Sequence, residues 1–188
     1  KQVFIHGFLT RDGQKISKSL GTGIDPYELI NKYGTDAVRY YMLAKVHPYE
    51  DSDFTYQKFE ESYNSDLANG LGNLVARIAK LAEINNVEAG KSDVKIIDKF
   101  ISEPLEQYRF DWALEEIWKK IKILDIKINT EKFWENTKTK IVSFVEVIEG
   151  IRQIAYDLKP FLPETAEKIE EQFKGPKIKS GPSLFPRL

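Results

Sequence analysis

Two lysines separated by two residues lie near the start of the chain, in the run Lys15-Ile16-Ser17-Lys18-Ser19. Asp12-Gly13 and Gly21-Thr22-Gly23 flank this run on either side. A lysine ammonium group is a compact charge on a flexible stem, suited to neutralising the charge that develops when a phosphate ester is attacked. Serine hydroxyls add hydrogen bonds, and glycines let the backbone approach a ligand closely. The pattern predicts a loop that holds polyphosphate; the alternative is a solvated surface loop.

A second group of polar residues, Asn69, Asn73 and Arg77, follows a spacing of four residues. On a helix this spacing gives a polar stripe about 120° from the centre of the apolar face. Two amides and a guanidinium group can read base edges and a phosphate. In the alternative interpretation, the asparagines bond to neighbouring helices and Arg77 is solvated.

Trp134 lies in the polar stretch 130–136, which is predicted to be a loop. An exposed indole there can stack on an unpaired base, a contact worth about 1 to 3 kcal/mol. The alternative is a tryptophan that caps the core. Trp112 and Trp118 lie where a helix would bury at least one of them.

The composition is that of a soluble globular protein, with 188 residues, 41% hydrophobic and 30% charged. No apolar run approaches the ~20 residues that span a bilayer, and the start lacks a secretory signal. A cytoplasmic location and no membrane contact are therefore expected. The chain also lacks an initiator methionine, which suggests that it begins inside a longer protein.

The absence of cysteine excludes disulfides and thiolate metal sites. The two histidines, His6 and His47, are too few for a typical zinc cluster, so no metal site is expected in this chain. The net charge of -1 means that contact with nucleic acid must come from a local patch.

The hydrophobic pattern predicts mainly helices. A capping residue and a proline at Asp25-Pro26 begin one that ends at Gly34, and Thr35-Asp36 caps the next. Thr55 opens a long amphipathic helix, with apolar residues spaced by three or four. Further helices are expected over 94–107, from Asp111, over 141–158 and from Pro163 to about Phe173, with a loop over 129–136. The sum is a mainly α fold: an antiparallel helical bundle over 55–174 behind a small mixed segment, 1–54, with an irregular tail over 175–188.

Several segments of the chain resemble those of a known family. The run 15–19 is similar to the Lys-Met-Ser-Lys-Ser signature of class I aminoacyl-tRNA synthetases. Segments in matching order and spacing favour methionyl-tRNA synthetases over their relatives. These segments are His6-Gly7-Phe8-Leu9, Asp25-Pro26, Asp36-Ala37-Val38-Arg39-Tyr40-Tyr41, Asp51-Ser52-Asp53-Phe54, the run from Tyr63 to Arg77, the run from Leu158 to Ala166, and Leu184-Phe185-Pro186-Arg187.

The resemblance implies a role for each candidate residue. Lys15 and Lys18, chiefly Lys18, would stabilise the pyrophosphate charge while methionyl-adenylate forms from methionine and ATP with Mg²⁺. Ser17 and Ser19 would support the ATP-binding loop. Asn69, Asn73, Arg77 and Trp134 would recognise the anticodon of the methionine tRNA, with Trp134 stacking on a base. The helical bundle would then be the anticodon-binding domain of a class I synthetase.

Two substitutions depart from the family pattern: Ile16 replaces the signature methionine, and Phe133 stands where a proline often precedes the stacking tryptophan. The upstream nucleotide-binding half, its His-x-Gly-His signature and the cysteine zinc knuckle are also missing. The chain is therefore expected to be the C-terminal part of the enzyme, unable to catalyse the reaction without the N-terminal half as partner. The alternative is a helical interaction module that has lost RNA recognition.

Overall fold

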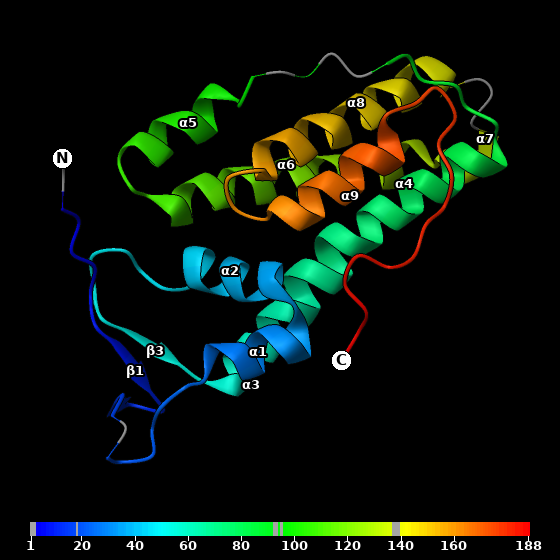
Figure 1. Ribbon diagram of the computed structural model, residues 1–188. Coiled ribbons are helices and arrows are strands. Elements are labelled where there is room, and N and C mark those ends of the chain that lie inside the picture. Colours follow the sequence, from blue (N-terminus) through cyan, green and yellow to red (C-terminus); the bar gives the residue numbers. More distant parts are fainter. Residues whose placement is uncertain (1–2, 18, 92–93, 95, 137–139) are drawn as a thin grey trace.

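The computed structural model describes residues 3–17, 19–91, 94, 96–136 and 140–188, so Lys18 of the predicted loop lies outside the described residues. A small sheet and the first helices occupy one end of the molecule, and longer helices lie side by side at the other (Figure 1). In chain order the elements are β1 (Leu9–Arg11), β2 (Gln14–Lys15), α1 (Pro26–Tyr33), α2 (Thr35–Ala44), β3 (Ser52–Phe54), α3 (Tyr56–Ser62), the π-helical segment η1 (Tyr63–Gly72), α4 (Asn73–Ile84), α5 (Lys99–Glu106), α6 (Phe110–Glu131), α7 (Phe133–Asn136), α8 (Ile141–Leu158) and α9 (Pro163–Phe173).

The sheet joins a hairpin to a strand that comes about forty residues later. Its strand order is β2-β1-β3; β1 and β2 are antiparallel, and β1 and β3 are parallel. Asp12 and Gly13 connect β1 to β2 with φ angles of 51° and 72°. Two consecutive positive φ angles match the tight turn that favours Asp-Gly, so the sequence Asp12-Gly13 fixes the register of the hairpin.

The predicted helix pair after the loop is confirmed. The Asp25 carboxylate caps α1 by accepting the N–H of Tyr27 at 2.8 Å, and Gly34, with φ of 88°, separates α1 from α2. The sequence predicted that Asp36 helps to cap its own helix, α2, but it does not. Its side chain is buried and accepts the backbone N–H of Thr165 at 2.6 Å, at the start of α9. Asp36 thus caps a helix that lies 129 residues further along the chain.

The long amphipathic segment is helical from Tyr56 to Ile84, capped at Thr55, whose hydroxyl accepts the N–H of Lys58 at 3.0 Å. Its middle part, η1, is wound as a π-helix with i→i+5 hydrogen bonds, which sequence periodicity did not anticipate. The predicted apolar face is confirmed, because its central side chains are buried: Phe59, Tyr63, Leu67, Leu71, Leu74 and Ile78.

Three boundaries in the second half differ from the prediction. The helix predicted over 94–107 is restricted to α5, which begins at the cap Asp98 and contains Pro104. Helix α6 begins one residue before Asp111, and the Asp111 carboxylate pairs with Arg109 at 2.6 Å. The predicted loop 129–136 is largely helical: α6 continues to Glu131 and ends at Lys132, which has a left-handed φ of 48°.

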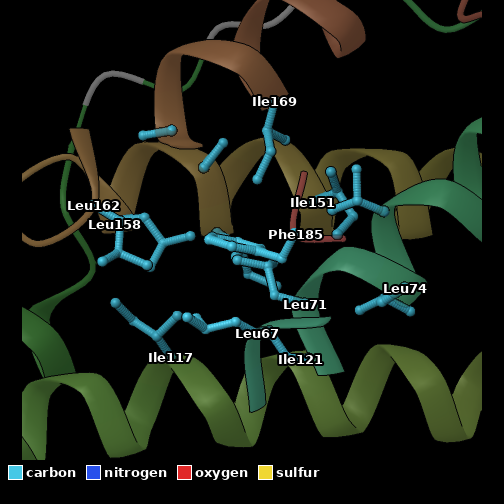
Figure 2. Close-up of a cluster of buried hydrophobic side chains, with 14 of the residues drawn as sticks. Leu67, Leu71, Leu74, Ile117, Ile121, Ile151, Leu158, Leu162, Ile169 and Phe185 are labelled. Carbon is cyan, nitrogen blue, oxygen red and sulfur yellow. The ribbon is translucent and has the colours of Figure 1, made fainter. Parts of the chain in front are cut away.

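One hydrophobic core joins the long helices to the tail (Figure 2). Leu67 and Leu71 of η1, Ile117 of α6 and Ile151 of α8 all belong to it, and all four are at most 1% exposed. Phe185 of the irregular tail also enters the core, and its ring stands at 90° to that of Tyr63. Each such side chain contributes about 1.5–3 kcal/mol when fully buried. The predicted tail is thus irregular in backbone but fixed in place.

The mixed segment and the helical part share this core, because α2 packs against α6 and against the turn between α8 and α9. Arg39 donates from Nε to the carbonyl oxygen of Phe161 at 2.6 Å and from Nη2 to that of Pro160 at 2.8 Å. Carbonyl groups at a helix C-terminus favour such a cation. The predicted picture of a bundle that stands behind a distinct mixed segment is therefore corrected: α2 is built into the bundle. Of the helices described, none combines the length and apolar character needed to cross a membrane.

Candidate functional site

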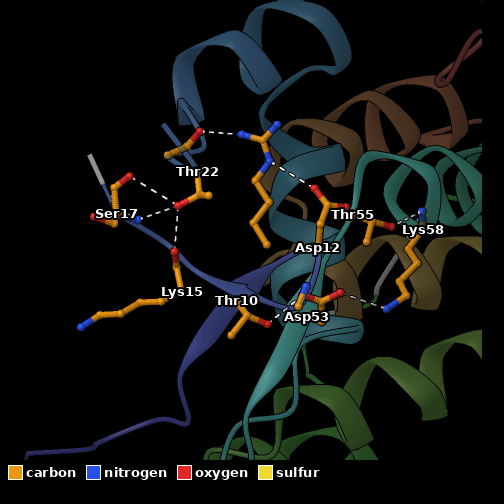
Figure 3. A network of polar contacts seen from close by, with 11 residues as sticks. Thr10, Asp12, Lys15, Ser17, Thr22, Asp53, Thr55 and Lys58 are labelled. Atoms are coloured by element: carbon orange, nitrogen blue, oxygen red, sulfur yellow. Dashed lines mark hydrogen bonds and ion pairs between the residues drawn. The ribbon is translucent and has the colours of Figure 1, made fainter. Parts of the chain in front are cut away.

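The predicted phosphate-binding loop starts where β2 ends (Figure 3). Its two sides, residues 15–17 and residues 22–23, form a neck that Thr22 closes. Oγ1 of Thr22 donates to the carbonyl oxygen of Lys15 at 2.7 Å and accepts the N–H of Ser17 at 2.9 Å. The hydroxyls of Ser17 and Ser19 lie 2.9 Å apart. The exposed Lys15 side chain extends away from this network. The loop therefore presents an ammonium group from a backbone that hydrogen bonds hold.

The far side of the neck is tied to the sheet by Arg11 of β1. Its Nη1 donates to the carbonyl oxygen of Gly23 at 2.9 Å, and its guanidinium carbon lies 5.4 Å from the centre of the Tyr56 ring. Both ends of the loop are thus connected to the strands that carry it, one through β2 and the other through Arg11.

The hairpin under the loop is fastened to β3 by Asp53. Oδ1 of Asp53 accepts the N–H of Gly13 at 2.8 Å and the hydroxyl of Thr10 at 2.7 Å, and Oδ2 lies 3.6 Å from Nζ of Lys58. The hydrogen bond from the Gly13 amide, with that from Thr10, holds the pKa of Asp53 below its usual value. The ionised carboxylate therefore fixes the turn that leads into the loop.

Three of the four predicted RNA-contact residues lie together in a groove of about 480 Å³ between η1, α4 and α6. Asn69 and Asn73 are exposed, and Arg77 is half-buried. The α6 side of the groove includes Trp118, whose indole stacks on Tyr40 with ring centres 4.5 Å apart. A groove with amides on one wall and an aromatic side chain on the other can accept a planar, hydrogen-bonding ligand.

Arg77 is paired with α6, so the alternative in which it is simply solvated is wrong. Its Nη1 donates to Oδ1 of Asp125 at 2.7 Å, and its Nη2 donates to Oδ1 of Asn129 at 2.8 Å. Asn129 in turn donates to Oδ2 of Asp125 at 3.1 Å. This network holds the guanidinium plane across the groove. Within the described residues, the side-chain amides of Asn69 and Asn73 make no hydrogen bond to a neighbouring helix, so their polar groups face solvent.

Trp134 lies in α7, beyond the end of α6, and its side chain is 53% exposed. The residue before it, Phe133, is fully buried and packs against Phe144 with ring centres 4.9 Å apart. Phe133 therefore fills the core position, and the alternative that Trp134 caps the core is wrong. Trp134 is not among the residues that line the groove, so the structure does not bring all four predicted residues into one surface.

Sequence reasoning missed Thr22, Arg11 and Asp53 at the loop, and Asp125 and Asn129 at the groove. Thr22 carried a local signal, because a threonine beside glycines is a common partner for loop backbone groups. The other contacts join residues that are 12 to 52 positions apart, which local patterns do not reveal. Among the described residues, no group of three or more histidine, aspartate and glutamate side chains could hold a metal ion.

Comparisons with known proteins give matches over the whole chain. The family model "tRNA synthetases class I (M)" matches residues 1–79. A methionine–tRNA ligase of Clostridium acetobutylicum is 37% identical and one of Thermosynechococcus vestitus is 33% identical, each over 100% of this chain. The chain spans only 35% and 39% of the lengths of these two proteins. A Mycobacterium tuberculosis methionyl-tRNA synthetase structure, bound by methionyl-adenylate, matches 97% of this chain and 43% of its own, with a TM-score of 0.82 at 24% identity.

These matches complete the correction of the predicted fold class. The family model for the class I synthetase region runs through the predicted boundary at residue 54 and covers α3, η1 and half of α4, with Asn69, Asn73 and Arg77. The matching solved structure aligns with 97% of this chain, on both sides of the predicted boundary, with a TM-score of 0.82. A mixed segment followed by a separate anticodon-binding bundle is therefore wrong as a fold class. The residue boundaries 1–54, 55–174 and 175–188 stay a prediction.

Proposed function

Because this chain is homologous over its whole length to the methionine–tRNA ligases of class I, we propose that it takes part in charging tRNA with methionine. The reaction joins methionine to tRNA through methionyl-adenylate and consumes ATP with Mg²⁺. The chain spans only 35% and 39% of the lengths of the two curated relatives, so the remaining part of such an enzyme is its necessary partner in this proposal. We place the activity in the cytoplasm, where tRNA charging supplies translation.

The loop over residues 15–19 is the part of the chain that acts on ATP in this proposal. Lys15 and Lys18 would stabilise the negative charge that develops on pyrophosphate as the adenylate forms, with Ser17 and Ser19 supporting the loop. The observation that carries this role is the exposed Lys15 side chain on a neck closed by Thr22. Mg²⁺ would travel with the ATP phosphates, as it commonly does at nucleotide sites.

The groove between α4 and α6 is the proposed tRNA contact. Asn69 and Asn73 offer amide donors and acceptors that match base edges. The Arg77 guanidinium group would contact the tRNA in a fixed orientation rather than as a mobile cation, because Asp125 and Asn129 already accept its hydrogen bonds. The exposed Trp134, which lies in α7 beyond the C-terminal end of α6 and outside the groove, would stack on an unpaired base. Titration with transcripts that carry an altered anticodon distinguishes contacts with the anticodon from contacts with other parts of the tRNA.

The activation role is tested by methionine-dependent exchange of pyrophosphate into ATP, measured on the full-length protein that contains this chain. Lys18→Ala is expected to lower kcat by about 10²–10³-fold, with Lys15→Ala showing a smaller loss. Lys168→Ala, at an exposed position of α9, serves as the control and is expected to leave the rate unchanged. Equal rates in all three variants would remove the loop from the reaction.

One observation also fits the second candidate, a helical interaction module. Apolar side chains near the N-terminus are largely exposed, with Val3 at 86%, Ile5 at 83% and Phe8 at 79%. In the synthetase these side chains would contact the remaining part of the enzyme; in an interaction module they would contact another protein. The two candidates differ in RNA binding, which only the synthetase requires.

A further inference from the structure

The neck of the 15–19 loop contains a side chain that replaces a missing strand partner. Strand β2 ends at Lys15, which pairs with Thr10 of β1, so among the described residues the strand pairing does not continue to Ile16 and Ser17. The Thr22 hydroxyl takes the place of that strand. It satisfies the carbonyl oxygen of Lys15 and the amide of Ser17 with bonds of 2.7 and 2.9 Å. The backbone N–H of Thr22 also donates to the carbonyl oxygen of Ser17 at 3.3 Å.

These bonds close a ring between the two sides of the loop. The Lys15 carbonyl group and the Ser17 amide flank Ile16, and both are drawn toward Thr22 (Figure 3). Because both groups turn to the inside of the neck, the Lys15 side chain is left on the outside, where it is exposed. Gly21, with φ of 67°, provides the left-handed turn that returns the chain to Thr22.

The sheet keeps this ring in place from both sides. Lys15 belongs to β2, and the carbonyl oxygen of Gly23 accepts a hydrogen bond of 2.9 Å from Arg11 of β1. A rotation of the neck would therefore have to break the Thr22 bonds first. Among the described contacts of the neck, the Thr22 hydroxyl is the one side-chain group that connects its two sides.

We propose that Thr22 is a positioning residue for adenylate formation: its hydroxyl fixes the neck so that the Lys15 ammonium group faces the ATP phosphates. Thr22 acts through the backbone and does not touch ATP itself. The inference rests on the proposed function of the loop. A misplacement of about 1 Å in a group that stabilises a transition state can cost about 10²-fold in rate, so a single neck contact can govern activity.

Two substitutions separate the hydroxyl from the shape of the side chain. Thr22→Val keeps the volume and removes the hydroxyl; Thr22→Ser keeps the hydroxyl and removes the methyl group. Ser62→Ala is the matched control, because the Ser62 hydroxyl donates to the carbonyl oxygen of Lys58, within the helix and away from the loop. All three variants are first compared with the unchanged chain by circular dichroism, to establish equal folding.

The first readout is hydrogen exchange of the Ser17 amide in this chain, which requires no activity. We expect Thr22→Val to raise the exchange rate about tenfold, while Thr22→Ser and Ser62→Ala leave it near the original value. The second readout is pyrophosphate exchange by the full-length protein. There Thr22→Val is expected to lower kcat at least tenfold with little change in the KM for methionine, and Thr22→Ser to restore kcat.

The outcomes distinguish the two proposals. If Thr22→Val frees the Ser17 amide but kcat is unchanged, the neck does not position the loop for catalysis, and the inference is overturned while the enzyme assignment stands. An unchanged Ser17 amide in Thr22→Val overturns it equally. If the full-length protein shows no methionine-dependent exchange, even unsubstituted, the proposed function fails and the inference fails with it.

Discussion

Replacing Lys120 with methionine is expected to destabilise the chain by leaving a buried carboxylate without its cation. Lys120 of α6 lies between two acids: its Nζ is 2.9 Å from Oδ2 of Asp157 in α8 and 2.8 Å from Oδ2 of Asp98, the cap of α5. The Asp157 side chain is fully buried. Its Oδ1 keeps hydrogen bonds from the Asp98 amide and from Gln153 in the variant, but Oδ2 loses Lys120.

The size of the effect follows from burial. Removing one partner of a buried ion pair costs about 3–5 kcal/mol. The side chains of Lys120 and Asp98 are 26% and 31% exposed, so water offsets part of this loss. A decrease of about 2–3 kcal/mol in the free energy of unfolding is therefore expected for Lys120→Met. Methionine keeps the aliphatic stem, so lost packing contributes little.

The assay is urea unfolding at neutral pH, followed by circular dichroism. Lys119→Met is the matched control, because Lys119 is the preceding residue and, within the described part of the chain, pairs with Glu115 and Glu116 on the exposed face of α6. Its loss is expected to leave the free energy of unfolding nearly unchanged, because water screens exposed ion pairs. The double variant Lys120→Met/Asp157→Asn should recover about 1 kcal/mol or more relative to Lys120→Met. The reasoning is refuted if Lys120→Met and Lys119→Met have the same stability.

Three further outcomes are expected from the same kind of measurement. The hydrogen bond from Lys120 holds the pKa of Asp98 below its usual 3.8. The stability that Asp98 contributes is therefore complete above about pH 4 and is lost as the pH falls through the folded-state pKa. Between about pH 5 and pH 2, the free energy of unfolding, measured in urea, should fall less for Lys120→Met than for the unchanged chain. Phe133→Ala should cost about 3–5 kcal/mol because the ring is fully buried, whereas the half-exposed neighbour should tolerate Trp134→Ala within about 0.5 kcal/mol. Arg77→Met should cost less than about 1 kcal/mol in urea unfolding, because the carboxylate that it pairs with is 43% exposed.

The sequence correctly predicted the helix boundaries that depend on neighbouring residues. The Asp25 cap, the break at Gly34 and the start of the long helix at Thr55 depend on residues within four positions of one another, and all three were correct. The apolar spacing from Phe59 to Ile78 likewise identified the buried face, because a helix that packs against a core has apolar residues every three or four positions on that face.

The errors came from interactions between distant residues. Asp36 resembles a cap for its own helix, but it caps α9 because the fold brings Thr165 to it. The pairing of Arg77 with Asp125 and Asn129 was not predicted, because these partners come from α6, 48 and 52 positions along the chain. The fold class was wrong for the same reason: the pattern breaks near residue 54, but α2 and the long helices share one core across that break.

The most direct measurement of the central claim is tRNA binding by the groove, followed through the tryptophan fluorescence of this chain at low salt. A methionine tRNA transcript is titrated into the unchanged chain, Asn69→Ala/Asn73→Ala and Lys168→Ala, and a transcript with an altered anticodon separates anticodon contacts from contacts elsewhere. We expect saturable quenching by the unchanged chain and by Lys168→Ala, with affinity at least tenfold weaker for the double variant. Equal binding by all three proteins, or no binding by any of them, would contradict the account.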